Sequence, residues 1–436
     1  MINTAVDNPL VNVYVDDIPA IHADEGKPAM EFQQYSPDMT YTERPYPVFD
    51  CDMHFYEEAD SFTRYLPKEY AGLVRMANID GRNKMIVRGR VSDYIPNPTF
   101  DVVAAPCSGF EYFSGKNVHG KSFKEIVTPM KAIPEFTDPG ARMKLMDKMH
   151  VDAIVNFPTL ASILEVNFMD DPDGTQVFIH AFNQWMFDEW GFNVDNRIFT
   201  TPVMNLSKVD GACRELEWAL ERGAKTVLVR PAPVAGYRGP TSPFLPHADP
   251  FWRMIEENDI PVMFHASDSG YTKYTNDWAG SDLEMRPFEF DVFRALSEDQ
   301  RPIMDTVLAA VGQGMLSRFP KVKIASIECG SKWLNRAMEK FDTVYGKMPH
   351  MFAEHPRETI KRALYVAPYW EDPLQPLIET IGLDHILFNS DWPHPEGLAD
   401  PNEYALYAEN EVGVSPGDAA KIMGGNMFDL IGVTPG

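Results

Sequence analysis

The sequence predicts an α/β fold, a (β/α)8 TIM barrel, and three observations support this prediction. Short β-type runs alternate with helical patterns from residue 48 to the end of the chain, which is typical of βαβ units and a parallel sheet. Eight strands are expected with none left over, and this number favours a closed barrel over an open sheet. Polar residues suited to chemistry end four of these strands, as they do in barrel enzymes.

The expected elements follow one another in regular order. Each expected strand is a short, mostly apolar run, and the eight runs are residues 48–55, 152–157, 198–203, 225–229, 261–266, 322–327, 363–366 and 385–388. Helical spacing of apolar residues between most of them predicts helices at residues 141–149, 177–190, 211–222, 250–257, 303–319, 333–345 and 373–381. In the first helix Met143, Met146 and Met149 form one apolar stripe, which we expect to pack against the barrel.

Two segments fall outside this alternation. Residues 1–47 hold scattered Asp, Asn and Pro without a sustained period, and we expect an extended N-terminal arm. Residues 57–140 are punctuated by Pro and Gly, and we expect a subdomain inserted after the first strand, where barrels place active-site covers. The predicted organisation is therefore an arm, 1–47, and a barrel, 48–436, with an insertion at about 57–140. We expect this insertion and residues 267–300 to decide substrate specificity.

Composition excludes several classes of protein. The 436 residues carry 39 Lys and Arg against 64 Asp and Glu, a formal net charge of −25, which disfavours binding to nucleic acid or to anionic membranes. No run approaches the roughly 20 apolar residues of a membrane span, and the acidic start of the chain does not resemble a secretion signal. Four cysteines far apart, without a CxxC pair, fit a reducing compartment. We therefore expect a cytoplasmic protein.

The first strand, FDCDMHF, has two distinct faces. Because side chains alternate across a strand, Asp50, Asp52 and His54 share one face and the apolar residues share the other. If the apolar face packs against helices, the two acids and the histidine point into the barrel. Charge is expensive there unless it is paired or bound to a metal ion. The first strand therefore suggests a metal site.

Four expected strand ends carry residues that bind metals. They are Asp52 and His54 on the first strand, His265 on the fifth, Glu328 on the sixth and Asp391 on the eighth. Imidazole and carboxylate together can hold Zn, Mn or Fe. Each residue alone has a structural alternative: a hydrogen-bonded pair on the first strand, a core histidine, a helix-capping or ion-paired glutamate, and a turn-forming aspartate. Their joint occurrence at four strand ends favours the metal site.

Other residues are candidates for supporting roles. His394 stands beside Asp391 and is a candidate catalytic or substrate-contacting group, with a surface loop as the alternative. Arg230 ends the fourth strand, where it could bind a substrate carboxylate or pair with an acid. The remaining candidates for contact with substrate are Asp268, Tyr271 and Trp392, with ordinary packing as the alternative for Trp392. Glu57 and His180 are candidates for contact with the metal ligands, and for His180 a place in the core or at an interface is the favoured alternative.

Several motifs together resemble a known family. They are DxDxH on the first strand, FHxxDSGY on the fifth, the Cys-Gly turn after the sixth, SDWPHPEG after the eighth, and the closing KIMGGNMFDLIG. Across residues 48–433 the chain resembles the amidohydrolase superfamily, in the branch that contains aminocarboxymuconate semialdehyde decarboxylase and related hydroxybenzoate decarboxylases. The resemblance implies a distorted (β/α)8 barrel and a catalytic divalent metal held by Asp52, His54, His265 and Asp391.

The chain departs from this family at two positions. The family's first ligand is commonly His or Glu, whereas this chain has the shorter Asp52. The sixth strand of the decarboxylases usually ends in a catalytic His within a His-Gly-Gly turn, and here Glu328 takes that place. A glutamate transfers protons near neutral pH only if burial raises its pKa. The substitution also makes the pocket acidic enough to hold two metal ions instead of one, with Glu328 among the ligands.

The sequence therefore predicts a metal-dependent enzyme that acts on a small organic acid, amide or lactone by hydrolysis or non-oxidative decarboxylation. We expect Zn or Mn, with Fe as a third candidate, Asp391 as ligand and proton acceptor, and Glu328 as an acid/base group. Two alternatives stay open: a subunit of a dinuclear Fe or Mn/Fe monooxygenase of the 2-aminoisobutyrate hydroxylase type, or a metal-bound supporting subunit of such a complex. We expect a homodimer, or a hetero-oligomer with a related barrel subunit.

Overall fold

The computed structural model divides the chain into a short unit, Met1–Glu31, and a large one, Phe32–Gly436. It describes residues 31–435 apart from 93, 95–97, 118, 237, 281–291 and 299, and all elements below belong to the large unit. Most of the predicted arm, residues 1–30, lies outside the described residues. Residues 32–47 contain no helix or strand. Here Thr42 donates a backbone hydrogen bond to Asp400 (2.7 Å).

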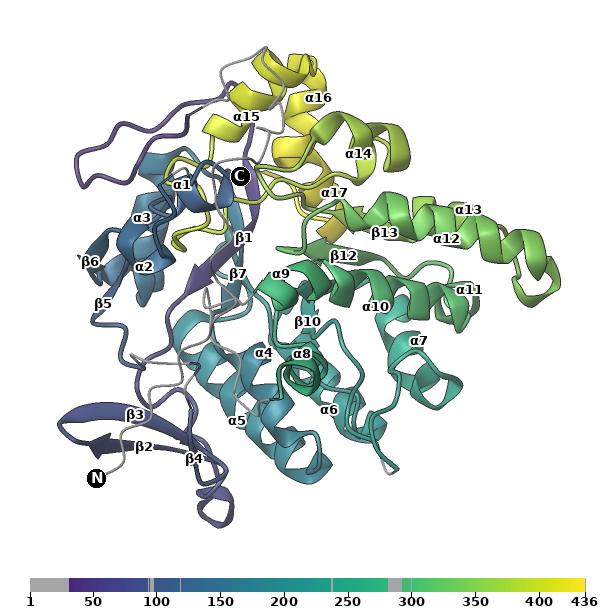
Figure 1. Cartoon of the computed structure of the whole chain (residues 1–436), viewed down its shortest axis with the longest axis horizontal. Helices are drawn as coiled ribbons and strands as arrows, with labels where there is room; N and C mark the ends of the chain where they lie inside the picture. The colour runs from purple at the N-terminus through teal and green to yellow at the C-terminus, as the bar shows by residue number, and fades with distance from the viewer. Residues whose placement is uncertain are drawn as a thin grey trace, which may run out of the picture. The chain divides into compact units, whose positions relative to one another are not determined.

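The strands expected for the alternating part of the chain form two parallel sheets (Figure 1). The first sheet has the order β1-β7-β8 and the second the order β13-β12-β11-β10-β9. Their bounds are β1 (Phe49–Phe55), β7 (Ala153–Pro158), β8 (Ile198–Thr200), β9 (Val203–Met204), β10 (Val227–Val229), β11 (Val262–His265), β12 (Ile324–Ile327) and β13 (Leu364–Val366). All seven residues of β1 are buried. The α/β class and the parallel pairing are thus as predicted.

The expected strand at 198–203 is wrong as a single element, because it is divided into β8 and β9. Pro202 has no backbone N–H and so cannot continue a regular ladder. Hydrogen bonds nevertheless cross the break. Thr201 donates to Asn156 on β7 (3.1 Å), and Leu228 on β10 donates to Pro202 (2.9 Å).

The expected strand at 385–388 is also wrong. A short 3-10 helix, η7 (Leu383–His385), occupies its first residue, and the remainder is too short for a regular ladder. Single hydrogen bonds still join this segment to both neighbours: Leu387 donates to β13 (2.9 Å) and Phe388 accepts from β1 (3.0 Å). The segment therefore lies between the last and first strands without being a strand itself.

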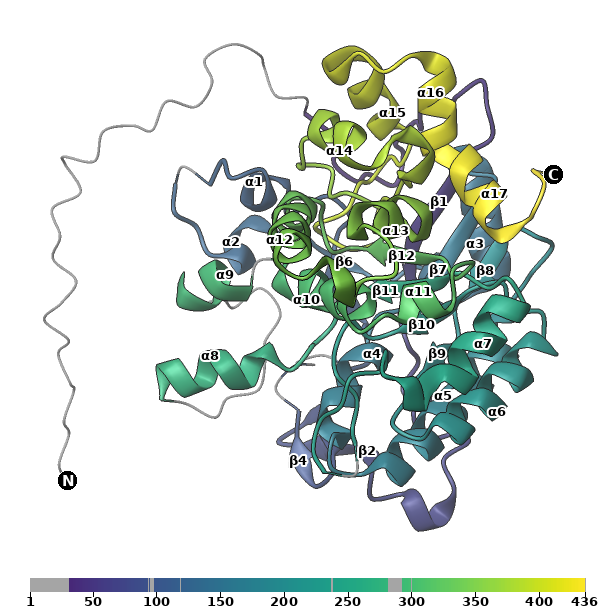
Figure 2. The same cartoon turned by 90° about the vertical axis from the view of Figure 1, so that its right-hand side faces the viewer.

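Helices alternate with the parallel strands and cover them on the outside (Figure 2). They are α3 (Pro139–Met149), α5 (Pro172–Trp190), α6 (Val209–Leu220), α7 (Asp249–Glu257), α10 (Arg301–Gly312), α11 (Met315–Arg318), α12 (Trp333–Lys347), α13 (Pro356–Ala363) and α14 (Leu374–Ile381). The single helix expected at 303–319 is wrong, because Gly314 adopts a φ of 76° and separates α10 from α11. Both α3 and α5 begin earlier than expected, at an Asp-Pro pair whose aspartate accepts a backbone hydrogen bond from the first turn.

Shorter helices complete the described chain. They are α4 (Ala161–Leu164), α8 (Tyr271–Ala279) and α9 (Val292–Glu298), followed near the C-terminus by α15 (Glu403–Tyr407), α16 (Pro416–Ala420) and α17 (Asn426–Ile431). The predicted specificity segment 267–300 contains α8 and α9, while its residues 281–291 and 299 lie outside the described residues. None of the described helices is both long and apolar enough to cross a membrane.

The segment between β1 and α3 contains more regular structure than its composition suggested. It holds an antiparallel sheet of β2 (Val74–Ile79), β3 (Arg82–Val87) and β4 (Arg90–Val91), a second pair of β5 (Val102–Ala104) and β6 (Pro129–Lys131), and the short helices α1 (Phe110–Phe113) and α2 (Phe123–Ile126). The β2–β3 turn is Asp80-Gly81, with both residues at positive φ. This is the dipeptide that two-residue hairpins prefer, and it was the overlooked indication of strands here.

Candidate metal centre

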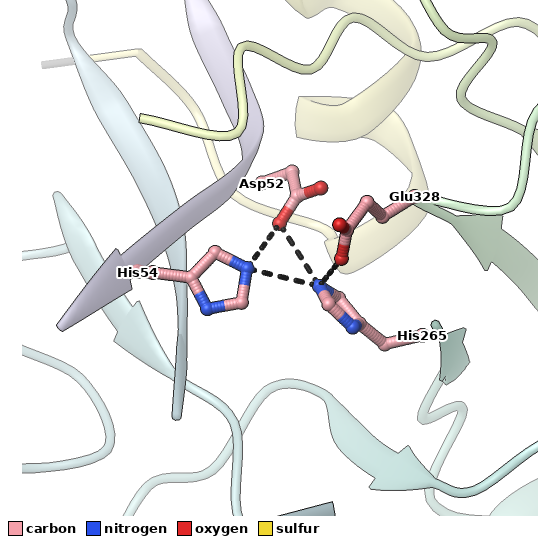
Figure 3. A group of neighbouring side chains, drawn as sticks. All are labelled: Asp52, His54, His265 and Glu328. Atoms are coloured by element: carbon pink, nitrogen blue, oxygen red, sulfur yellow. Dashed lines mark hydrogen bonds and ion pairs between the residues drawn. The ribbon is translucent and has the colours of Figure 1, made fainter. Parts of the chain in front are cut away.

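Side chains from three parallel strands meet at the carboxyl ends of these strands. Figure 3 shows Asp52 and His54 from β1, His265 from the end of β11 and Glu328 just after β12 converging on one point. His54 Nε2 lies 3.0 Å from His265 Nε2, and Asp52 Oδ1 lies 3.3 Å from each of these nitrogens. Glu328 Oε2 lies 3.1 Å from His265 Nε2.

Asp391 joins this cluster from the segment after the expected eighth strand. Its Oδ1 lies 3.5 Å from His54 Nε2 and 2.7 Å from His394 Nδ1. Three overlapping groups of ligand atoms result, each with all its atoms within 4.8 Å of one another. They are Asp52, His54, His265 and Glu328; His54, Asp391 and His394; and Glu328, Asp391 and Glu396. The structure therefore brings together all five predicted ligands.

The spacing of the ligand atoms fits a cation. Ligands about 2.0–2.2 Å from a metal ion at angles of about 90–110° lie roughly 3.0–3.5 Å from one another. The separations among Asp52, His54, His265, Glu328 and Asp391 quoted above fall in this range. The donor set, two imidazoles and three carboxylates, suits Zn, Mn or Fe.

Backbone contacts fix the orientation of these ligands. His265 Nδ1 lies 2.9 Å from the carbonyl oxygen of Ala266, which leaves Nε2 to face the cluster. Asp50 Oδ1 accepts hydrogen bonds from the backbone N–H groups of Asp52 (3.1 Å) and Ser390 (2.9 Å). It thereby holds the end of β1 against the segment that carries Asp391. The backbone N–H of Asp391 donates in turn to the carbonyl of Asp52 (2.9 Å).

Burial and mutual charge perturb the titration of the cluster. Burial lowers the pKa of His54 to about 3. For His265 burial also lowers the pKa, but the charges of Asp52 and Glu328 outweigh it and raise the pKa to about 9. Burial and neighbouring carboxylates raise the pKa of both Glu328 and Asp391 well above the ordinary carboxyl value. Such opposed shifts among crowded acids and imidazoles are characteristic of functional sites.

Arg230 and Asp268 lie beside each other but outside the ligand groups. The Arg230 guanidinium donates to the carbonyls of Asp268 (2.9 Å) and Pro233 (3.1 Å) and lies 4.0 Å from Glu165. These contacts agree better with the alternative that Arg230 pairs with an acid than with the binding of a substrate carboxylate. Asp268 accepts a hydrogen bond from the Gly270 N–H (2.9 Å), which holds the turn that follows β11.

Tyr271 and Trp392 contact residues outside the ligand cluster. The Tyr271 hydroxyl donates to Asp305 at the side of α10. The Trp392 side chain is fully buried, with the Arg142 guanidinium 4.6 Å from its ring centre. Trp392 is thus a core residue, as the packing alternative for this residue predicts.

The two residues predicted to support the ligands, Glu57 and His180, lie in different places. Glu57 is buried just after β1 and accepts a hydrogen bond from the backbone N–H of Leu160 (2.7 Å), and burial raises its pKa to about 8. His180 on α5 pairs with Glu215 on α6 (2.8 Å) and packs its ring against Trp218. It therefore joins two outer helices, and the structure does not bring it to the ligand groups.

Glu396 and Arg142 were not predicted from the sequence. Glu396 belongs to one ligand group and stands in the SDWPHPEG segment two residues after His394, so its motif was noticed but its side chain was not. Arg142 on α3 is fully buried and donates to the carbonyls of His54 (2.6 Å) and Glu135 (2.9 Å). An arginine among the apolar residues of a helix was the available indication.

Comparisons with known proteins identify similar sequences and similar folds. A family model described as amidohydrolase matches residues 49–428. A crystal structure of an amidohydrolase from Mycobacterium avium subsp. paratuberculosis K-10 is 36% identical, with a TM-score of 0.84 over 89% of this chain and 99% of that one. None of the curated proteins matches the chain.

Two more distant structures share the fold. A dihydroxybenzoic acid decarboxylase from Polaromonas sp. JS666, with bound manganese and the inhibitor 2-nitroresorcinol, is 17% identical, with a TM-score of 0.56 over 89% of this chain and 97% of that one. A 5-carboxyvanillate decarboxylase from Novosphingobium aromaticivorans DSM 12444, complexed with manganese and 4-hydroxy-3-methoxy-5-nitrobenzoic acid, is 16% identical, with a TM-score of 0.56 over 90% and 98%.

Proposed function

The chain belongs to the amidohydrolase family, and on this premise we propose that it is a metal-dependent enzyme acting on a small organic acid, amide or lactone by hydrolysis or non-oxidative decarboxylation. One observation carries the proposal: five ligand-type side chains from β1, β11, the residue after β12 and the segment of Asp391 meet at the separations of a metal coordination sphere. The monooxygenase alternative finds no support in the comparisons.

Asp52, His54, His265, Glu328 and Asp391 would hold one divalent ion. When bound, the ion polarises a substrate oxygen or lowers the pKa of water towards neutrality. Manganese in two decarboxylases of the same fold supports testing Mn²⁺ first and Zn²⁺ second. Asp50 and the Ala266 carbonyl hold the ligands in place through the backbone contacts described above.

Exposure indicates the side from which substrate enters. The side chains of Glu328 and His394 are 19% and 13% exposed, whereas that of Asp52 is fully buried. Glu328 therefore faces the substrate and positions it, with Oε2 directed at the ligand cluster. Asp391 accepts a proton and holds it between Oδ1 and His394 Nδ1, which lie 2.7 Å apart. In hydrolysis this proton comes from water and passes to the leaving atom. In decarboxylation the bond between the carbon and the carboxylate breaks to release CO2, the proton held by Asp391 passes to that carbon, and water then reprotonates Asp391.

We also infer that the hydrogen bonds of residues 386–392 close the strands into a distorted (β/α)8 barrel. Three backbone contacts support this inference: Leu387 with β13, Phe388 with β1, and His54 with Trp392 (2.8 Å). In this proposal residues 57–140 form the insertion after β1. Its helix α1 reaches the site, because Gly109 donates to the carbonyl of Pro395 (2.8 Å).

Metal analysis of two histidine variants tests the proposed function. His265→Ala should lose most bound Mn²⁺, because it removes a buried ligand, while the matched control His180→Ala should keep it. Full metal content in His265→Ala would overturn the assignment. The Mn²⁺-loaded protein is then assayed with hydroxybenzoates, amides and lactones, and release of CO2 or of a new carboxylate distinguishes decarboxylation from hydrolysis. A metal-loaded but inert chain across this panel would favour the supporting subunit.

A further inference from the structure

Both ring nitrogens of His394 contact polar side chains. Nδ1 lies 2.7 Å from Asp391 Oδ1, and Nε2 lies 3.3 Å from the hydroxyl oxygen of Thr159, the residue directly after β7. We propose that Thr159 is a positioning residue that keeps a hydrogen on His394 Nε2 and so leaves Nδ1 to exchange the proton of Asp391. This inference rests on the proposed function, in which Asp391 accepts a proton, and deepens it by assigning the route of that proton.

The hydroxyl hydrogen of Thr159 forms a bond to the backbone. Thr159 Oγ1 donates to the carbonyl oxygen of Phe55 (2.8 Å), and a carbonyl oxygen only accepts. A threonine hydroxyl has one hydrogen, so towards His394 the same oxygen acts as an acceptor. The contact of 3.3 Å between Thr159 Oγ1 and His394 Nε2 is therefore a hydrogen bond that Nε2 donates. This holds whether the ring is neutral or cationic, because both forms keep the hydrogen on Nε2.

The same two contacts set the orientation of the His394 ring. Rotating the ring by half a turn would place Cδ2 against Asp391 and Cε1 against Thr159, and both hydrogen bonds would be lost. The rings of His54 and Tyr56 pack beside that of His394, with ring centres 4.2 and 5.8 Å away. Hydrogen bonds and packing thus hold Nδ1 towards Asp391.

Thr159 is held in place by the segment at the end of β1. Glu57, a buried acid just after this strand, accepts a hydrogen bond from the backbone N–H of Leu160, the residue after Thr159 (2.7 Å). The carbonyl of Phe55, the last residue of β1, accepts the Thr159 hydroxyl. Because β1 also carries the ligand His54, these two bonds fix the Thr159 hydroxyl relative to the ligand cluster.

The position of the hydrogen on Nε2 determines the route of the proton. In the neutral ring with this hydrogen, Nδ1 has a free electron pair directed at Asp391 Oδ1. A proton bound by Asp391 crosses to Nδ1, which gives an imidazolium and a carboxylate, and it returns through the same two atoms. In the opposite tautomer Nδ1 already carries a hydrogen and has no electron pair for a second one. The Thr159 hydroxyl therefore selects the tautomer that accepts a proton from Asp391.

Valine at position 159 tests this assignment, because it has nearly the shape of threonine without the hydroxyl. Beside valine an N–H at Nε2 would have lost its acceptor, so the hydrogen should move to Nδ1 and donate to Asp391. Nitrogen NMR of the full chain, with isotope-labelled histidine and bound Zn²⁺, distinguishes the two tautomers, and His394→Gln identifies the signals of His394. We expect a hydrogen on Nε2 in the wild type and in Thr159→Ser, and none in Thr159→Val.

Thr306→Val is the matched control. The Thr306 hydroxyl also donates to a backbone carbonyl at 2.8 Å, that of Pro302, and the residue is buried. Its loss should leave the hydrogen on His394 Nε2 in place. On any substrate that the wild type converts, Thr159→Val should lower kcat at least ~10-fold, with KM and Zn²⁺ content unchanged. Thr159→Ser should keep most of kcat, because it retains the hydroxyl.

Three results would overturn the role of Thr159: Nε2 of His394 without a hydrogen in the wild type, Nε2 with a hydrogen in Thr159→Val, or an unchanged kcat in Thr159→Val. If this variant does not fold, neutron diffraction from wild-type crystals in heavy water decides the question. Deuterium on Nε2 supports the proposal, and a Thr159 hydroxyl deuterium directed at Nε2 overturns it. A wild type that binds no Zn²⁺ would contradict the proposed metal centre, while the Nε2 hydrogen in the same sample still decides the role of Thr159.

Discussion

Gly397 allows the segment that carries Asp391 to turn back towards Ser390, and replacing Gly397 tests how the fold positions Asp391. A methyl group at this position would lie 2.6 Å from the backbone oxygen of Asp391 and even closer to that of Ser390. Both obstacles are backbone atoms, so no side-chain rotation can relieve the clash. We therefore expect Gly397→Ala to lower the free energy of unfolding by about 3 kcal/mol, the upper end for overpacking. The displaced segment should also weaken Mn²⁺ binding at least ~10-fold, as loss of ligand support does.

Gly346 provides the matched control for this substitution. It lies in α12, where an added methyl group meets nothing within 4 Å. Because alanine is the better helix former, Gly346→Ala should raise the free energy of unfolding by about 0.5 kcal/mol. Urea unfolding followed by circular dichroism gives both values, and titration with Mn²⁺ gives the affinities. Equal stability and equal Mn²⁺ affinity in the two variants would refute the reasoning.

Three further predictions concern stability. Arg142→Met removes buried charged hydrogen bonds to His54 and Glu135, so it should lower the free energy of unfolding by about 3 kcal/mol, measured in urea; a change below about 1 kcal/mol would contradict this. Mn²⁺ at ~1,000 times its Kd should raise the Tm by about 5 °C for a unit of this size, seen by calorimetry, and an unchanged Tm would argue against a bound ion. The hydrogen bond to Glu215 raises the pKa of the partly exposed His180. The ion pair therefore stabilises the folded protein at pH values below the pKa of an unfolded histidine, and this stabilisation is lost as the pH rises through the pKa of the folded state. His180→Gln should thus lower the free energy of unfolding by about 0.5 kcal/mol at pH 5.5 and by less at pH 9, measured in urea. A decrease that does not depend on pH would contradict a stabilising ion pair.

The fold class followed from the sequence because burial leaves a strong pattern. Strands such as 152–157 and 261–266 are short, mostly apolar runs, and the structure confirms them as β7 and β11 within a residue or two. The prediction failed where one residue overrides the pattern. Pro202 divides an apolar run that reads as a single strand, and Gly314 divides a periodic run that reads as a single helix.

The candidate site was predictable where a residue's type and position determine its surroundings. Asp52 and His54 alternate with apolar residues on a buried strand, so their direction followed from strand geometry. The surroundings of Arg230 depend on which acceptors the loops bring near it, and strand position does not encode them. The prediction that Trp392 contacts substrate has a related weakness, because the residue that packs on its ring, Arg142, is distant in sequence.

Glu328 and Asp391 were both among the predicted ligands, but nothing in the sequence indicated their backbone conformation. Glu328 and Asp391 adopt φ angles of 49° and 55°, in the left-handed region that residues other than glycine seldom occupy. Local preference would continue the extended chain at both positions. Instead the backbone turns sharply at each acid, so that side chains from two distant segments meet over the cluster. Such conformations persist only where the surrounding structure imposes them, and they concentrate at functional sites. The hydrogen bonds that impose them at Asp391 come from Asp50 and Asp52, more than three hundred residues away.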